Sequence, residues 1–165
     1  MTMINLEELA RFLVKAKKRN YAGDGREITS ERLGFKELEF IEGDWNYRDS
    51  YVGFFSAPGQ EVVRFRGEPV WVMSYSGGMT PKFRDDINFA KETFGFLKKA
   101  LSLITEDAPY RGPETFSEDS KTYYQNSYTG DITNFRGSEK IVHTEGRIRG
   151  IVFAQDYIGG LVLPK

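Results

Sequence analysis

The stretch YRDSYVG at residues 47–53 occurs a second time in the chain, as YQNSYTG at residues 124–130. Four of the seven positions are identical, and Asp49 corresponds to the nearly isosteric Asn126. A segment that recurs within one chain is typical of a supersecondary unit that is present twice. We therefore take internal duplication as the starting point for predicting the fold.

Further matches extend this repeat outward, in the same order in both halves. They are FLVKA at 12–16 with FLKKA at 96–100, GQEVV at 59–63 with GSEKI at 137–141, and VWVMSYSGG at 70–78 with VFAQDYIGG at 152–160. The offset between the copies changes only at turns that contain Gly or Pro, where insertions cost little. The shared order predicts two equivalent halves, about 1–80 and 81–165, within a single domain of residues 1–165.

Each half is predicted to be one helix followed by a four-stranded antiparallel meander. An open meander has exposed edges, so docking of the two halves should bury those edges or close the sheet. The predicted fold class is therefore α+β and internally duplicated. Two helices would pack on one face of a large curved antiparallel sheet, or a barrel-like closure would surround them.

The first helix is predicted from Asn5 to about Arg19, with Asn5 as its cap and an apolar stripe that includes Leu9 and Leu13. The basic run at 15–19 fits the negative end of the helix dipole. Residues 24–34 are predicted to be an irregular connector.

The second helix is predicted to begin at Thr80 and Pro81, and apolar residues then recur every three or four positions from Ile87 to Ile104. Gly95 lies inside this helix, which suggests close packing against the other helix.

Strands are predicted from alternation of polar and apolar residues, and Gly pairs at 77–78 and 159–160 are expected to end strands at close backbone approaches. The acidic run between Glu37 and Asp44 is expected to be solvated. The predicted strands are 37–40, 45–53, 61–66 and 70–75 in the first half, and 122–128, 132–135, 139–143 and 148–157 in the second.

Composition excludes several classes of function. The 165 residues carry a net charge of −1 with acids and bases interspersed, which argues against direct nucleic-acid binding. The chain has no Cys, so disulfides and thiolate metal sites are excluded. No apolar run is long enough to span a membrane, and residues 1–10 lack the pattern of a signal peptide. We expect a cytoplasmic protein without membrane contact.

Six segments together resemble an uncharacterised bacterial and archaeal domain family whose members occur alone or behind an XRE-type helix-turn-helix. They are LEF at 38–40, EGD at 42–44, YRD at 47–49, GQEV at 59–62, VWVMSYSGG at 70–78 and APYRGP at 108–113. The family has no established activity, so the resemblance transfers no catalytic residue. It implies association with transcriptional regulators and a sensor or effector-binding role. Residues 1–20 hold one helix, so no DNA-binding domain is expected within this chain.

The best candidate site combines the two copies of the repeated strand. If the halves dock face to face, their Tyr, Asp and Asn side chains converge beside an aromatic wall, which is typical of a small-molecule pocket. The single carboxylate could hold a cationic ligand, and Arg111 an anionic one. The candidate ligand-binding residues are Tyr47, Asp49, Tyr51, Trp71, Tyr75, Tyr110, Arg111, Tyr124, Asn126, Tyr128, Phe153 and Tyr157.

Each candidate also has a structural interpretation. The Tyr residues could be cross-strand packing on a half-buried sheet, with Asp49 bonded to Arg48 or to a backbone amide. Arg111 could be paired with a nearby acid. His143, the only histidine, is interpreted as a packing residue, because no base or nucleophile partner is evident.

Three functions remain open. The first is a non-enzymatic small-molecule-binding or sensor-type domain of unknown ligand. The second is a protein-interaction module that forms a homodimer or docks through exposed aromatics or sheet edges. The third is an enzyme that uses Asp49 with a Tyr or Arg partner. We expect no cofactor and no metal, and we assign no catalytic residue.

Overall fold

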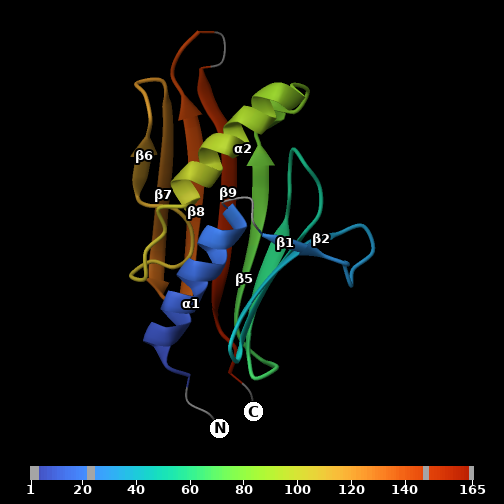
Figure 1. The fold of residues 1–165 in the computed structure, drawn as a ribbon. Coiled ribbons are helices and arrows are strands. Elements are labelled where there is room, and N and C mark those ends of the chain that lie inside the picture. Colours follow the sequence, from blue (N-terminus) through green and yellow to red (C-terminus); the bar gives the residue numbers. More distant parts are fainter. Residues whose placement is uncertain (1–3, 22–24, 147–148, 164–165) are drawn as a thin grey trace.

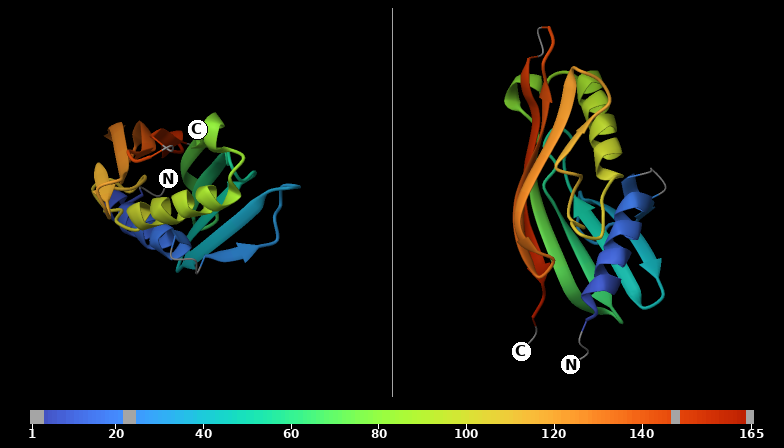
Figure 2. Two further views of the ribbon diagram at one scale, coloured as in Figure 1. Left: turned by 90° about the horizontal axis from the view of Figure 1, so that it is seen from above. Right: turned by 90° about the vertical axis from the view of Figure 1, so that its left-hand side faces the viewer.

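In the residues that the computed structural model describes, 4–21, 25–146 and 149–163, two α-helices lie across one face of an antiparallel sheet (Figure 1). Figure 2 shows that the sheet curves around the helices. The predicted α+β class, with two helices on a large curved antiparallel sheet, is confirmed. The elements are α1 (Leu6–Arg19), β1 (Arg26–Ile28), β2 (Lys36–Glu42), β3 (Trp45–Tyr51), β4 (Gly59–Phe65), β5 (Glu68–Met79), a 3₁₀ turn (Pro81–Phe83), α2 (Ile87–Leu101), β6 (Thr115–Ser117), β7 (Thr122–Asp131), β8 (Asn134–His143) and β9 (Gly150–Leu161).

The described strands form one nine-stranded sheet in the order β1-β2-β3-β4-β5-β9-β8-β7-β6. The short strands β1 and β6 are its two edges, so the sheet is open. Of the two predicted arrangements, the curved open sheet is found and the barrel-like closure is not. Short edge strands leave few unpaired backbone groups on which another chain could build.

The centre of the sheet is the pairing of β5 with β9, which we call the seam. It runs from the pair Trp71 and Leu161 to the pair Met79 and Phe153. Glycines allow close backbone approach here, as predicted, since a Cβ at Gly77 would lie 2.2 Å from the carbonyl oxygen of Ala154 on β9. The glycine pairs also lie at the ends of their strands, as predicted, because β5 ends at Met79 and β9 at Leu161, each one residue beyond its pair.

Helix α1 begins as predicted, because the Asn5 side chain accepts hydrogen bonds from the backbone N–H groups of Glu7 and Glu8. Its apolar stripe packs on the sheet through residues that include Leu9 and Leu13, both fully buried. Lys17 is also fully buried, although it belongs to the basic run at 15–19 that the helix dipole accounts for.

Helix α2 begins later than predicted. Thr80 precedes the 3₁₀ turn and makes no side-chain capping bond there, whereas Asp86 caps α2 by accepting from the N–H groups of Asn88 and Phe89. Asp86 is therefore the cap of α2, in place of the predicted Thr80. A Cβ at Gly95 would meet no atom within 4 Å, so the predicted close approach of the other helix is also wrong.

Three strand predictions are corrected by the structure. The expected connector at 24–34 contains β1, and the segment after α2 contains the unpredicted β6. The segments 132–135 and 139–143 belong largely to one strand, β8, because Gly137 continues the pairing on both sides. The start of the last predicted strand, at residue 148, lies outside the described residues.

Two hydrophobic clusters fill the space between the helices and the sheet. One gathers around α1 and includes Tyr47, Trp71 and Tyr157, and the other gathers around α2 and includes Tyr124 and Phe153. The aromatic residues therefore build the core. Among the described residues, neither helix combines the length and apolar character that crossing a membrane requires.

Candidate functional site

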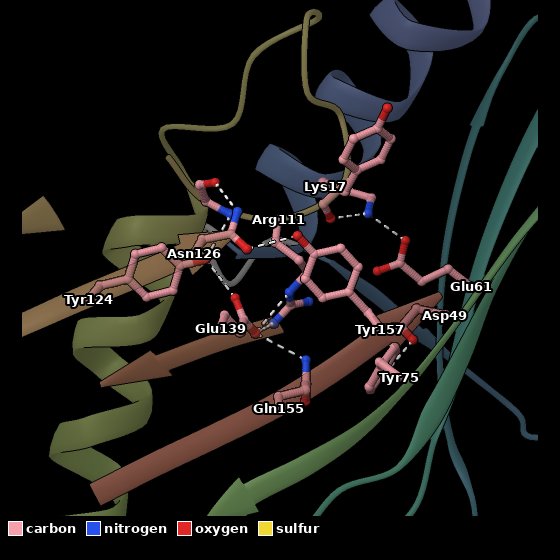
Figure 3. A network of polar contacts seen from close by, with 12 residues as sticks. Lys17, Asp49, Glu61, Tyr75, Arg111, Tyr124, Asn126, Glu139, Gln155 and Tyr157 are labelled. Carbon is pink, nitrogen blue, oxygen red and sulfur yellow. Dashed lines mark hydrogen bonds and ion pairs between the residues drawn. The ribbon is translucent and has the colours of Figure 1, made fainter. Parts of the chain in front are cut away.

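Polar and charged side chains lie between the helices and the sheet, where the two hydrophobic clusters meet (Figure 3). They come from α1, from the loop after α2 and from strands on both sides of the seam. We call this set the buried polar network. Its members are Lys17, Asp49, Glu61, Tyr75, Arg111, Tyr124, Asn126, Glu139, Gln155 and Tyr157.

On the β3–β5 side of the seam, the Tyr75 hydroxyl donates to Asp49 Oδ1 at 2.7 Å. Asp49 lies directly opposite Glu61 in the pairing of β3 with β4. Lys17 Nζ lies 2.7 Å from Glu61 Oε2 and donates to the Tyr110 carbonyl at 2.6 Å. Helix α1 therefore places one cation between a strand carboxylate and the loop after α2.

On the β7–β9 side, the Glu139 carboxylate is the centre of the network. It accepts from Arg111 Nε at 2.9 Å and Nη2 at 2.6 Å, from the Tyr124 hydroxyl at 2.6 Å and from Gln155 Nε2 at 3.0 Å. Removal of a carboxylate from water is costly unless its oxygens are hydrogen-bonded and paired with a cation, and Glu139 has both. The structural interpretation of Arg111, pairing with a nearby acid, is thus confirmed.

Asn126 connects this network to the loop after α2. Its Oδ1 accepts from the Tyr157 hydroxyl at 2.7 Å, and its Nδ2 donates to the Gly112 carbonyl at 2.8 Å. Gly112 N–H in turn donates to the Tyr124 hydroxyl at 3.0 Å. Two of these hydrogen bonds therefore hold the loop to β7, and the third joins β7 to β9.

Electrostatics single out Asp49. Burial and the charge of Glu61 raise the pKa of Asp49 to about 7, against the opposing effects of the Tyr75 hydrogen bond and of the cations Arg111 and Lys17. Burial likewise lowers the pKa of Lys17, although Glu61 opposes this. Asp49 makes no ion pair among the described residues. Arg111 and Lys17 therefore compensate the negative charge of its carboxylate only in part.

Tyr21 also belongs to this region. Burial raises the pKa of Tyr21 well above its usual value, and Arg111, Glu61 and Asp49 all lie near enough to act on it. Its hydroxyl is buried and has no hydrogen-bond partner among the residues described. A buried hydroxyl that makes no hydrogen bond lowers the stability of the fold.

The twelve predicted site residues do not form one open pocket. Six of them, Asp49, Tyr75, Arg111, Tyr124, Asn126 and Tyr157, are brought together in the network. Four are packed in the core, since Tyr47, Trp71, Tyr110 and Phe153 are at most 2% exposed. Tyr51 is half-buried and Tyr128 is 42% exposed. The expected bond from Asp49 to Arg48 is not found, because Arg48 pairs with Glu31, Glu37 and Glu39.

A groove opens beside this network, between the loop after α2 and β7. It has a volume of about 440 Å³, and we call it the α2–β7 groove. Two predicted site residues, Asn126 and Tyr128, line it together with Asp107 and Glu114. The Tyr128 ring packs edge-on against Tyr110, with 5.1 Å between the centroids, so the aromatic wall is held by the core.

Sequence reasoning missed the burial of Lys17, Glu61 and Glu139, although a signal was present. Lys17 follows Leu13 by four residues and so lies on the apolar stripe of its helix. Glu61 and Glu139 share a strand face with Val63 and Ile141, because side chains alternate. A charged residue at a position where the helix or strand periodicity predicts an apolar one is the pattern that would have identified all three residues as buried.

Two further predictions concern single residues. Glu37 is only 2% exposed and accepts from the Ser50 hydroxyl at 3.0 Å, so the expectation of a fully solvated acidic run is wrong there. His143 lies 3.0 Å from the Thr122 hydroxyl and packs edge-on against Phe89, in agreement with a packing role. No group of His, Asp and Glu in the described part of the chain is arranged to hold a metal ion.

Comparison with known proteins identifies a family but no characterised relative. Neither the comparison with curated proteins nor the comparison with solved structures found a match. A family model described as "Domain of unknown function (DUF5680)" matches residues 49–162, from the second half of β3 to the end of β9. Because this match covers more than half of the chain, the protein belongs to the DUF5680 family of uncharacterised domains.

Proposed function

We propose that this chain is a small-molecule-binding, sensor-type domain and that its ligand occupies the α2–β7 groove. The observation that carries the proposal is that Asn126 takes part in both the groove and the buried polar network. It lines the groove and also bonds to Tyr157 and Gly112 within the buried polar network. A ligand that contacts this amide would act directly on the hydrogen bonds that hold the loop after α2.

The groove favours a small organic cation. Asp107 and Glu114 supply two carboxylates, and no Lys or Arg is found among its described lining residues. Leu103, Pro113 and the exposed Tyr128 ring add apolar surface, and an aromatic face attracts a cation. A volume of about 440 Å³ lies within the range of small-molecule sites. We therefore expect an amine with an apolar body.

The test is a titration of the full chain with organic amines of increasing size, followed by calorimetry and by amide chemical shifts. We expect saturable binding, with shifts at Asn126, Gly112 and Tyr157. Tyr128→Ala and Asp107→Asn should each weaken binding by about tenfold, because each removes one attraction for the cation.

A matched control is available on the same strand. Tyr123 is 37% exposed and lies outside the groove, so Tyr123→Ala should leave amine affinity unchanged. Equal losses in Tyr123→Ala and Tyr128→Ala, or no saturable binding of any amine, would contradict the proposal.

We also propose that the two halves arose by duplication, since equivalent residues of the repeat make matching contacts. Tyr75 donates to Asp49 and Tyr157 donates to Asn126, both at 2.7 Å. In the seam Tyr75 lies opposite Tyr157, its own equivalent, as a twofold relation between the halves requires. Superposition of β2–β5 with β6–β9, α1 and α2 included, tests this: a different strand order or handedness would overturn it.

The setting of the domain is proposed from the family resemblance alone. A cytoplasmic sensor that works with an XRE-type transcriptional regulator would fit a ligand-binding role. Co-purification of the chain with such a regulator, sensitive to the amine ligand, is the expected result. The raised pKa of Asp49 supports the alternative of an enzyme. Arg111, however, is hydrogen-bonded to Glu139 and not to Asp49, which speaks against Arg111 as its catalytic partner.

A further inference from the structure

Strand β7 has a free edge over its second half. Its neighbour β6 is short and pairs with β7 only at residues 123–125, so Figure 1 shows β6 beside one end of β7. One further backbone bond follows, from Asn126 N–H to the Glu114 carbonyl at 2.9 Å. The chain then leaves the edge, because Gly112 is bonded to the buried side chains of Asn126 and Tyr124. Within the described residues, no strand covers β7 from residue 127 to residue 131.

Tyr128 presents its backbone to this open side. In an antiparallel strand, the N–H and C=O groups of every second residue point to the same side. Asn126 N–H points away from β8, and the pairing of β7 with β8 is regular, so the N–H and C=O groups of Tyr128 also point away from β8. The carbonyl of Ser127 points the other way, since a Cβ at Gly137 on β8 would lie 2.7 Å from its oxygen.

The α2–β7 groove adjoins this edge. Asn126, Ser127 and Tyr128 are consecutive residues of β7, and all three line the groove. Side chains alternate between the two faces of a strand, so consecutive residues line one groove where it reaches the strand edge. Residues directly opposite each other in a sheet direct their side chains to the same face. A residue paired with Tyr128 would therefore direct its side chain to the groove face, where Asp107 and Glu114 lie.

The first half of the chain shows a strand in the equivalent position. In the repeated sequence, Tyr51 on β3 corresponds to Tyr128 on β7. Strand β2 pairs with β3 over its whole length and places Lys36 opposite Tyr51. The edge beside Tyr128 has no such neighbour among the described strands. The geometry around this tyrosine is therefore compatible with an added antiparallel strand that carries a lysine at this position.

From these observations we infer that the α2–β7 groove binds an extended peptide segment of a partner protein, which adds as a strand antiparallel to β7 and places a lysine opposite Tyr128. Main-chain hydrogen bonds to a free strand edge provide affinity, and the side-chain position provides specificity. Asp107 and Glu114 supply two carboxylates for the ammonium group, and the Tyr128 ring supplies an aromatic face. The inference rests on the proposed function, because the lysine side chain would be the amine with an apolar body.

The test uses the full chain and two probes. One is an acetylated and amidated peptide of about five residues, the length of the free edge, with a central lysine between threonine and valine residues. The other is butylamine, which reproduces the lysine side chain alone. Calorimetry should show the peptide binding about tenfold more tightly, because two hydrogen bonds to the Tyr128 backbone are added. The Tyr128 amide should exchange with solvent more slowly with the peptide and not with butylamine.

Methylation of the peptide backbone provides a matched control. The residue opposite Tyr128 directs its N–H to the Tyr128 carbonyl, whereas the next residue directs its N–H to solvent. Methylation of the lysine N–H should therefore abolish the gain over butylamine, and methylation of the next N–H should preserve it. Replacement of the lysine by norleucine should lower affinity by about tenfold, because the charge is lost. These changes leave the protein unaltered, so misfolding cannot produce the result.

Four outcomes would overturn the inference. Equal affinity for the peptide and butylamine would exclude strand addition but leave the proposed amine site in place. Equal losses from the two methylations would also exclude pairing with Tyr128. Undiminished binding of the norleucine peptide would exclude the lysine as the residue that the groove selects. Binding of neither probe would overturn the inference together with the proposed function.

Discussion

The regions on the two sides of the seam use the same geometry with different chemistry. On one side Tyr75 donates to Asp49, and on the other Tyr157 donates to Asn126, at the same 2.7 Å distance. Glu61 and Glu139 then lie next to these residues, each with one cation. Either a carboxyl group or an amide can therefore accept the hydrogen bond from the tyrosine hydroxyl. Only the carboxyl group can become negatively charged, by losing its proton.

The surroundings of the two glutamates differ as well. Glu139 accepts from three different side chains, whereas Glu61 pairs with Lys17 alone among the described residues. The β7–β9 side is thus the better satisfied one, and the β3–β5 side carries the less compensated charge.

The largest expected effect is the loss of a buried cation. Lys17→Met and Arg111→Met should each destabilise the fold by about 3–5 kcal/mol, because each leaves a buried carboxylate unpaired. Lys17→Met should be the more harmful, since Glu139 keeps its bonds to Tyr124 and Gln155 when Arg111 is lost. Unfolding in urea measures both.

The exposed Lys98→Met is the control and should stay within about 0.5 kcal/mol of the parent. Addition of Glu61→Gln to Lys17→Met should restore part of the loss, because it removes the unpaired charge. A larger cost for Arg111→Met than for Lys17→Met would contradict the contrast between the two sides.

The second effect depends on pH. The pKa of Asp49 is raised from 3.8 to about 7 in the folded protein, so folding favours its protonated form. That stabilisation is fully present below the unfolded pKa and is lost as pH rises toward 7. Asp49→Asn removes this dependence. The variant should gain up to about 4 kcal/mol relative to the parent between pH 4 and pH 8.

The mirror substitution is Asn126→Asp, which places a second carboxyl beside the network. It should destabilise the protein more at pH 8 than at pH 5, the opposite trend to Asp49→Asn. Free energies of unfolding across this pH range measure both variants. Parallel pH curves for the parent and Asp49→Asn would show that Asp49 does not titrate in this window.

The smallest expected effect tests the similarity of the two sides. A Cβ at Gly59 would lie 2.4 Å from the Tyr75 hydroxyl, and one at Gly137 would lie 2.4 Å from the Tyr157 hydroxyl. Both alanine variants should therefore lose about 1–3 kcal/mol through overpacking. Gly95→Ala meets no atom within 4 Å and lies in a helix, so it should gain up to about 1 kcal/mol. Thermal unfolding distinguishes the three.

The sequence predicts the regular parts of this molecule well. The 3.6-residue period of apolar residues predicts both helices, and the alternation of polar and apolar residues predicts the strands that line the core. Both patterns arise because one side of each element faces the hydrophobic interior. The edge strands β1 and β6 were missed, since three residues are too few for a period and only one side of each is paired. Gly137 hid the continuity of β8, because a glycine has no side chain to show alternation.

The candidate site was predicted only in part, for a physical reason. Tyr75, Arg111 and Asn126 were identified as polar residues in aromatic surroundings, and the structure brings them into one network. Glu139, the partner of Arg111, and Lys17, the partner of Glu61, were not identified, because single-sequence reasoning assigns charged residues to the surface. Which cation meets which carboxylate depends on contacts between residues far apart in the chain, such as Lys17 with the Tyr110 carbonyl.

The pairing of β5 with β9 has a consequence for folding during synthesis. The central strand β5 ends at Met79, but its partner β9 ends only at Leu161. During synthesis on the ribosome, β5 must wait with one edge unpaired while about eighty further residues are made, and an unpaired edge invites aggregation. A chaperone that shields the nascent chain, or fast translation of this interval, should therefore raise the yield of folded protein.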